Sequence, residues 1–131
     1  MTFKPLEIDD YPVLKPPFER QAYDLSLYSL LSLLAWNGHV YRTSWRVEDS
    51  SVILAFRSDL DPQDRYLVLP VPPPEGLGAE DLARLARRAG IPTFWHVPDD
   101  WVERLGRPAL EARFRLSEQR EFEDYIYRTA D

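Results

Sequence analysis

The chain has 131 residues and a formal net charge of −6 at pH 7, with 44% hydrophobic and 29% charged residues. This length allows one sizeable hydrophobic core and is too short for two ordinary domains. Binding a nucleic-acid backbone over a large surface requires a positively charged face, which the negative net charge argues against. No DNA partner is therefore expected. The chain contains no cysteine, which excludes disulfides and thiolate metal sites.

The most apolar stretch, residues 25–36, is interrupted by Ser26, Ser29 and Ser32 and falls short of the roughly 20 residues that a membrane helix needs. The first ten residues, MTFKPLEIDD, lack the basic and apolar regions of a secretory signal. The sequence therefore predicts a chain without a membrane span and a cytoplasmic location.

The first third of the chain predicts one strand and two helices. Pro5 interrupts the apolar residues of TFKPLEI, which suits a short edge strand because proline cannot donate to a sheet ladder. Asp9 or Asp10 can cap a short helix, which Pro16 and Pro17 are expected to break or restart. The segment DLSLYSLLSLLAWNG has leucines at helical spacing and ends on a glycine, which predicts a second helix.

Residues 39–71 predict three strands joined by two turns, EDSS and SDLDPQD, whose residues favour tight reversals. The apolar runs SVILAF and YLVLPV are continuous rather than alternating, which is typical of central strands covered on both faces. We therefore expect helices to flank the sheet.

The segment GAEDLARLARRAG predicts an amphipathic helix that stops at Gly90, and IPTFWHV predicts the strand after it. With the preceding strand they form a right-handed βαβ unit, so part of the sheet is parallel. Glu80 can pair with Arg84 four positions on. Asp99 and Asp100 can cap the next short helix, and a final pair of strands closes the chain.

The predicted order is β, α, α, β, β, β, α, β, α, β, β, which is the order of the GNAT acyltransferase fold. The segments FKPLEIDDYPVLKPPFE, YDLSLYSLLSLLAWNGHVYRTSW and REFEDYIYRTAD resemble the opening half of the phosphatidylglycerol lysyltransferase C-terminal-domain family, whose soluble members consist of two GNAT-like halves in tandem. The resemblance implies an α/β (α+β) fold with a mixed, mostly antiparallel central sheet. It also implies that residues 1–131 are one GNAT-like domain, the N-terminal half of a longer protein.

The membrane-bound members of the family that this chain resembles transfer lysine from its tRNA to phosphatidylglycerol. The resemblance thus implies a parent that is an aminoacyl or acyl transferase, with aminoacyl-tRNA or acyl-CoA as donor. In that family the substrate tunnel and much of the tRNA-facing surface lie in the second half or between the halves. We therefore expect this segment to be mainly structural and to have no cofactor of its own. Its expected partner is the C-terminal GNAT-like half of the same protein, and the full-length parent is the form expected to bind tRNA.

Phe122, Tyr125 and Tyr127, in REFEDYIYRTAD, are the residues expected to contact that second half. Two alternatives stay open. The chain can be a standalone interaction module without chemistry, or a single-domain N-acetyltransferase that uses acetyl-CoA.

An active GNAT domain cradles the pyrophosphate of acyl-CoA with a Q/R-x-x-G-x-G/A loop at a helix N-terminus. In PPEGLGAED, Gly76, Gly78 and Ala79 fit the last part of this pattern and are the candidate cofactor-binding residues. Pro73 stands where glutamine or arginine is expected, and Asp81 would face the phosphates with like charge. The favoured interpretation is a degenerate loop, a Pro/Gly turn that leads into an acid-capped helix.

His39 and His96 are candidate general bases because imidazole titrates close to neutral pH. No serine or carboxylate lies beside them in an arrangement that would make a nucleophile, so we expect structural roles and assign neither a catalytic residue nor a metal site. The four tryptophans can line an acyl tunnel or stack on tRNA bases. Core packing and docking between halves are the favoured roles for them.

Overall fold

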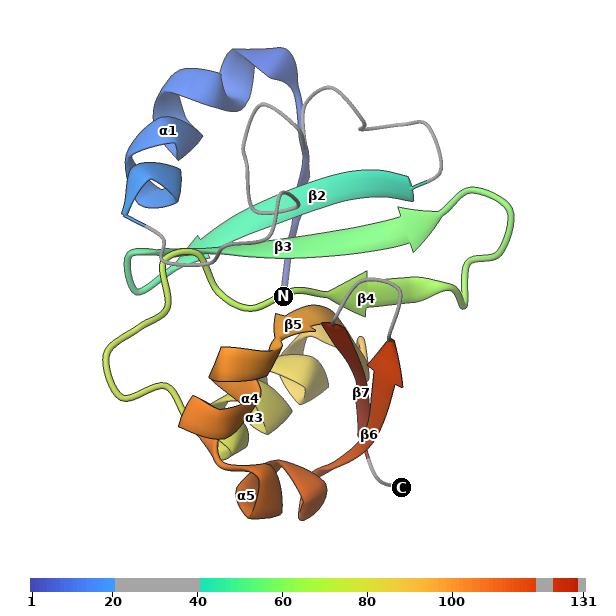
Figure 1. Ribbon diagram of the computed structural model, residues 1–131. Helices are drawn as coiled ribbons and strands as arrows, with labels where there is room; N and C mark the ends of the chain where they lie inside the picture. The colour runs from blue at the N-terminus through green and yellow to red at the C-terminus, as the bar shows by residue number, and fades with distance from the viewer. Residues whose placement is uncertain (21–40, 120–123, 130–131) are drawn as a thin grey trace.

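The structure is a computed structural model that describes residues 1–20, 41–119 and 124–129 (Figure 1). The predicted leucine-rich helix, His39 and Phe122 lie outside the described residues. Within those residues, no helix is long and apolar enough to cross a membrane.

The described strands form one mixed sheet of seven, in the order β1-β2-β3-β4-β5-β7-β6. Among the described strands only β4 and β5 pair in parallel, and the other neighbours are antiparallel. The predicted mixed and mostly antiparallel sheet is confirmed. The strands are β1 (Lys4–Pro5), β2 (Tyr41–Glu48), β3 (Ser51–Ser58), β4 (Arg65–Leu67), β5 (Thr93–Pro98), β6 (Phe114–Gln119) and β7 (Asp124–Thr129).

Helices lie on both faces of the sheet, as predicted. The described ones are the 3-10 turn η1 (Ile8–Asp10), α1 (Tyr11–Glu19), α3 (Ala79–Ala89), α4 (Asp99–Leu105) and α5 (Arg107–Glu111). Asp10, at the start of α1, bonds Trp45 of β2, whereas Arg88 of α3 pairs with Glu48 of the same strand. Positions 45 and 48 of a strand point to opposite faces, so α1 and α3 cover opposite faces. Figure 1 shows α1 beside β2 and β3, and α3, α4 and α5 gathered around β5, β6 and β7.

The β2–β3 hairpin turns on two residues, Asp49 and Ser50, with φ angles of 48° and 70°. Two successive left-handed residues match the right-handed twist of the flanking strands, so the predicted EDSS turn is confirmed. Strand β3 is buried from Ser51 to Phe56 on both faces. It is therefore the central strand that its continuous apolar run indicated.

The connection from β4 through α3 to the parallel strand β5 is confirmed as well, with Leu67 paired to Phe94. Helix α3 buries a stripe that includes Leu82 and Leu85, and it ends where Gly90 adopts a left-handed φ of 69°. A left-handed residue after the last turn lets the chain leave the helix without steric cost when that residue is glycine.

The predicted ion pair between Glu80 and Arg84 is wrong. Arg84 pairs instead with Asp81, one helical turn before it, and Glu80 lies 3.6 Å from the guanidinium of Arg113. Positions three apart on a helix are neighbours just as positions four apart are. Asp81 is turned toward the start of the helix, so its second oxygen is available to Arg84.

The predicted break at Pro16 and Pro17 is also wrong, because α1 continues through both. Their rings remove the hydrogen bonds to the carbonyls of Pro12 and Val13. Both of those residues are exposed, so water can hydrogen-bond the two carbonyls.

The acidic capping predictions are met in part: Asp10 is the N-cap residue of α1 and completes a capping box at η1, but no acidic side chain caps α1 or α4. Asp10 is N-terminal to α1 but makes no cap hydrogen bond there; its carboxylate accepts the backbone N–H of Glu7 instead. Asp99 and Asp100 lie in the first turn of α4, whose N-cap residue is Pro98. In the first turn their negative charges still favour the positive end of the helix dipole.

Candidate functional site

Strand β5 contains a bulge at Trp95 and His96. Phe94 pairs with Tyr127 and Val97 pairs with Tyr125, so these two residues stand opposite the single residue between the tyrosines. His96 has a φ of 57°, a conformation that costs a non-glycine residue about 1–2 kcal/mol. Such strain and such bulges gather beside functional sites, where they redirect side chains.

The bulge brings both rings to one side of the sheet. The indole of Trp95 and the imidazole of His96 stack, with centroids 4.8 Å apart and planes inclined by 17°. In a regular strand, consecutive side chains point to opposite faces and could not stack in this way. Both rings lie against the ring of Tyr66 of β4, with centroid separations of 4.7 Å for Trp95 and 5.9 Å for His96.

Tyr66 is the centre of an aromatic cluster drawn from four adjacent strands. It stacks on Phe56 of β3 at 4.8 Å and meets Tyr41 of β2 edge-on at 5.2 Å. We call Tyr41, Phe56, Tyr66, Trp95 and His96 the aromatic cluster. It lies where the parallel strand β5 meets the antiparallel strands.

The two phenols of the aromatic cluster stay protonated at neutral pH. Burial, together with a hydrogen bond donated by the Tyr41 hydroxyl to Asp64 at 2.9 Å, raises the pKa of Tyr41 to about 12. Burial, with the nearby Tyr41 and Asp64, raises the pKa of Tyr66. Both hydroxyls therefore keep a proton that they can donate in a hydrogen bond, and neither is a base at neutral pH.

The indole Nε1 of Trp95 is buried and has no hydrogen-bond partner among the described residues. A buried donor without an acceptor costs about 1–3 kcal/mol, and native proteins leave few of them. An acceptor oxygen brought into the cluster would remove this cost. Strain at His96 and a donor at Trp95 that is unpaired among the described residues thus lie next to each other.

His96 therefore belongs to a distorted segment and not to the regular apolar strand that the sequence predicted. The rings that surround it in the aromatic cluster are Tyr66 and Trp95. Within the described ranges, no group of three or more His, Asp and Glu side chains is arranged to hold a metal ion.

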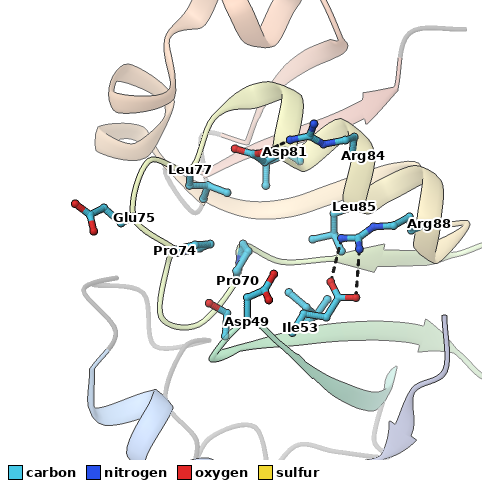
Figure 2. A pocket seen from close by; sticks show the side chains of 13 residues that line it. Asp49, Ile53, Pro70, Pro74, Glu75, Leu77, Asp81, Arg84, Leu85 and Arg88 are labelled. Carbon is cyan, nitrogen blue, oxygen red and sulfur yellow. Dashed lines mark hydrogen bonds and ion pairs between the residues drawn. The ribbon is translucent and has the colours of Figure 1, made fainter.

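A second candidate region is a cavity of about 410 Å³ at the start of α3, lined by residues of the β2–β3 turn, the loop after β4, and the helix. Figure 2 shows the side chains that line it. Its lining includes four carboxylates and two arginines, Arg84 and Arg88. Arg84 is paired with Asp81, and Arg88 with Glu48 at 3.0 Å. Glu75 points away from the other labelled residues (Figure 2). The unbalanced charge of this cavity is negative, which disfavours a polyphosphate.

The three predicted cofactor-binding residues lie at this helix start. Gly76 has a φ of 74°, Gly78 is the N-cap residue and Ala79 is the first helical residue. The N–H of Gly78 donates to the Asp81 carboxylate at 2.9 Å, and this bond, followed by that from Arg84, holds the pKa of Asp81 below its usual range. Asp81 thus occupies the position where a phosphate oxygen would bind.

The predicted contact residues Tyr125 and Tyr127 lie on β7, which pairs with β5 on one side and β6 on the other. The backbone of β7 is therefore engaged within the sheet, and β6 forms the edge. Their contact with a second half stays a prediction.

Sequence reasoning missed the aromatic cluster. The apolar strand pattern of IPTFWHV carries no sign of a bulge, because the extra residue is defined by pairing with β7, about thirty positions later. The recurrence of aromatics in four successive strands was the available signal. No family model, curated protein or solved structure matches the chain.

Proposed function

We propose that this chain is a GNAT-like domain of an aminoacyl or acyl transferase, in which the aromatic cluster forms one wall of the acyl channel. Catalysis is placed in a second GNAT-like half, with aminoacyl-tRNA or acyl-CoA as the donor of the whole protein. The observation that carries the proposal is the strand arrangement: antiparallel strands, a crossover helix, and one parallel strand that bulges where it joins them. This is the order that the family resemblance implies.

The chemistry of the aromatic cluster suits an acyl or aminoacyl group. Ring faces bind apolar chains through buried area and bind an ammonium group through the ring quadrupole. The N–H of Trp95, which has no acceptor among the described residues, can donate to the carbonyl oxygen of an ester or thioester. Because Tyr41 and Tyr66 keep their protons, these two hydroxyls orient a substrate and do not take a proton from it.

The start of α3 supports the proposal that the donor binds and reacts in the second half and not in this one. A diphosphate at this helix would have to displace Asp81 and enter a cavity whose unbalanced charge is negative. We therefore expect acetyl-CoA not to stabilise the chain. Thermal unfolding with millimolar acetyl-CoA tests this, since a ligand at about 100 times its Kd stabilises by about 2.7 kcal/mol. A saturable rise in Tm would favour the single-domain N-acetyltransferase instead.

The positive test follows the indole N–H resonance of Trp95 by NMR, assigned with the Trp95→Phe variant. Adding millimolar lysine methyl ester or alanine methyl ester should shift this resonance, because the ester carbonyl supplies an acceptor. The indole of Trp45 is an internal control, since its Nε1 already donates to Asp10 at 3.1 Å. An unchanged Trp95 resonance, or equal shifts at both indoles, would contradict the proposed channel wall.

A further inference from the structure

Three arginines stand side by side across three strands, on the face of the sheet opposite the aromatic cluster. Arg42 of β2 pairs in register with Arg57 of β3, and Arg57 pairs in register with Arg65 of β4. We call these residues the arginine row. Each is a sequence neighbour of a cluster ring, so alternation along the strands puts the rings on one face and the guanidinium groups on the other.

Directly opposed like charges destabilise a pair of antiparallel strands. The chain has 22 acidic residues against 16 basic ones, so carboxylates to offset this repulsion are abundant. Arg42 forms an exposed ion pair with one of these carboxylates, that of Asp59, at an N–O distance of 2.6 Å. Among the described residues, neither Arg57 nor Arg65 has a carboxylate partner. Two adjacent positive charges thus have no carboxylate partner within the described part of this acidic chain.

The arginine row lines a cavity of about 430 Å³. Its lining also includes apolar side chains, namely Phe3 from the N-terminal segment and Ala89 and Ile91 from the end of α3 and the residues after it. Ligand pockets combine such a volume and apolar lining with a few charged groups that fix orientation. Guanidinium groups in turn match the oxygens of carboxylates and phosphates in pairs.

We propose that the arginine row and this cavity form a binding site for a small organic anion, a carboxylate or phosphate attached to an apolar group. The oxyanion lies between Arg57 and Arg65 and relieves their repulsion, and the apolar group packs on Phe3 and Ile91. This site is separate from the cavity at the start of α3, whose lining is acidic. It does not depend on the transferase proposal, because it lies on the other face of the sheet.

The test measures Tm and binding heat for the whole chain with hexanoate and with hexyl phosphate. At least one should bind saturably and raise Tm, and the stronger of the two identifies the oxyanion class. Inorganic phosphate, which lacks the apolar group, and hexanol, which lacks the charge, should bind at least about tenfold more weakly. Equal binding of inorganic phosphate and hexyl phosphate would overturn the apolar half of the site.

Variants separate a binding role from a structural one. Arg57→Gln and Arg65→Gln should each weaken anion binding about tenfold or more while leaving the Tm of the unliganded chain unchanged or higher, because a like-charge contact is lost. Arg87→Gln is the matched control, since it removes the same charge from an exposed position of α3 outside the cavity.

Binding that is equally strong in Arg57→Gln, Arg65→Gln and Arg87→Gln would overturn the proposed site. So would an anion effect on Tm that is the same in all three variants. Should a short RNA bind through these arginines while hexanoate and hexyl phosphate do not, the surface would be a nucleic-acid contact and the proposal would be wrong.

Discussion

Replacement of Asp10 should strongly destabilise the fold, because this one carboxylate joins three segments. Its side chain is 9% exposed, and it accepts hydrogen bonds from the Lys4 ammonium at 2.6 Å, the Glu7 backbone N–H at 2.8 Å and the Trp45 indole at 3.1 Å. These contacts tie β1 and α1 to the central hairpin. The variants to compare are Asp10→Ala, which removes every acceptor, and Asp10→Asn, which keeps one oxygen.

The expected magnitude follows from the donors that are left behind. The Lys4 side chain is 52% exposed, so water replaces its partner at little cost. The Glu7 and Trp45 donors are partly buried, and each unsatisfied donor costs about 1–3 kcal/mol. With two such donors, we expect Asp10→Ala to lower the free energy of unfolding by about 2–6 kcal/mol, and Asp10→Asn by roughly half as much.

The dependence on pH has a defined sign. Burial raises the pKa of Asp10, but the hydrogen bonds from Lys4, Glu7 and Trp45 outweigh it and hold the pKa below the ordinary value of 3.8. The carboxylate therefore stabilises the fold fully above that ordinary value, and this stability is lost as the pH falls through the lower pKa of the folded chain. Urea unfolding at pH 7 and at acidic pH should show the gap between wild type and Asp10→Asn closing in acid.

The neighbouring Asp9→Asn variant is the control, since Asp9 is exposed and loses the same charge. A loss below about 0.5 kcal/mol in Asp10→Ala, or a loss in Asp9→Asn of equal size, would refute the reasoning, because surface substitutions stay within that range.

Three further changes have defined outcomes. Asp81→Ala removes the acceptor for the Gly78 N–H and should cost about 0.5–2 kcal/mol in thermal unfolding; an unchanged Tm would mean that this bond does not hold the start of α3. Gly90→Ala should cost about 1–2 kcal/mol by urea unfolding, because the positive φ disfavours alanine although no atom lies within 4 Å of the added carbon; a neutral result would contradict that φ. The protonated Tyr41 should stabilise the fold fully below its ordinary pKa of 10.0 and lose that effect as the pH rises toward about 12. The free energy of unfolding should therefore fall less steeply with rising pH in Tyr41→Phe than in the wild type, and an equal fall in both would contradict the raised pKa.

Much of the sheet was readable from the sequence because its determinants are local. The two-residue turn at Asp49 and Ser50 fixes the register of the β2–β3 hairpin, and counting back from it places Arg42 opposite Arg57. The apolar stripe and terminal glycine of α3 are equally local. The pairing of Arg42 with Arg57 was therefore within reach of the sequence, although it was not predicted.

Features that depend on distant partners were not readable. The bulge at Trp95 and His96 exists only in relation to β7, whose insertion between β5 and β6 does not follow from chain order. The course of α1 through Pro16 and Pro17 depends on solvent exposure of two carbonyls, which the sequence does not state. The pairing of Arg84 with Asp81 instead of Glu80 likewise depends on the orientation of the Asp81 carboxylate.

The parallel pairing of β4 with β5 divides the sheet into two antiparallel blocks. The first runs from β1 to β4 and the second consists of β5, β7 and β6, and the pairing between them joins Leu67 to Phe94, 27 positions apart. Closing a loop of this length costs entropy before the contact is made, whereas the β2–β3 hairpin closes across two residues. Amide hydrogen exchange should therefore separate the blocks into two cooperative units.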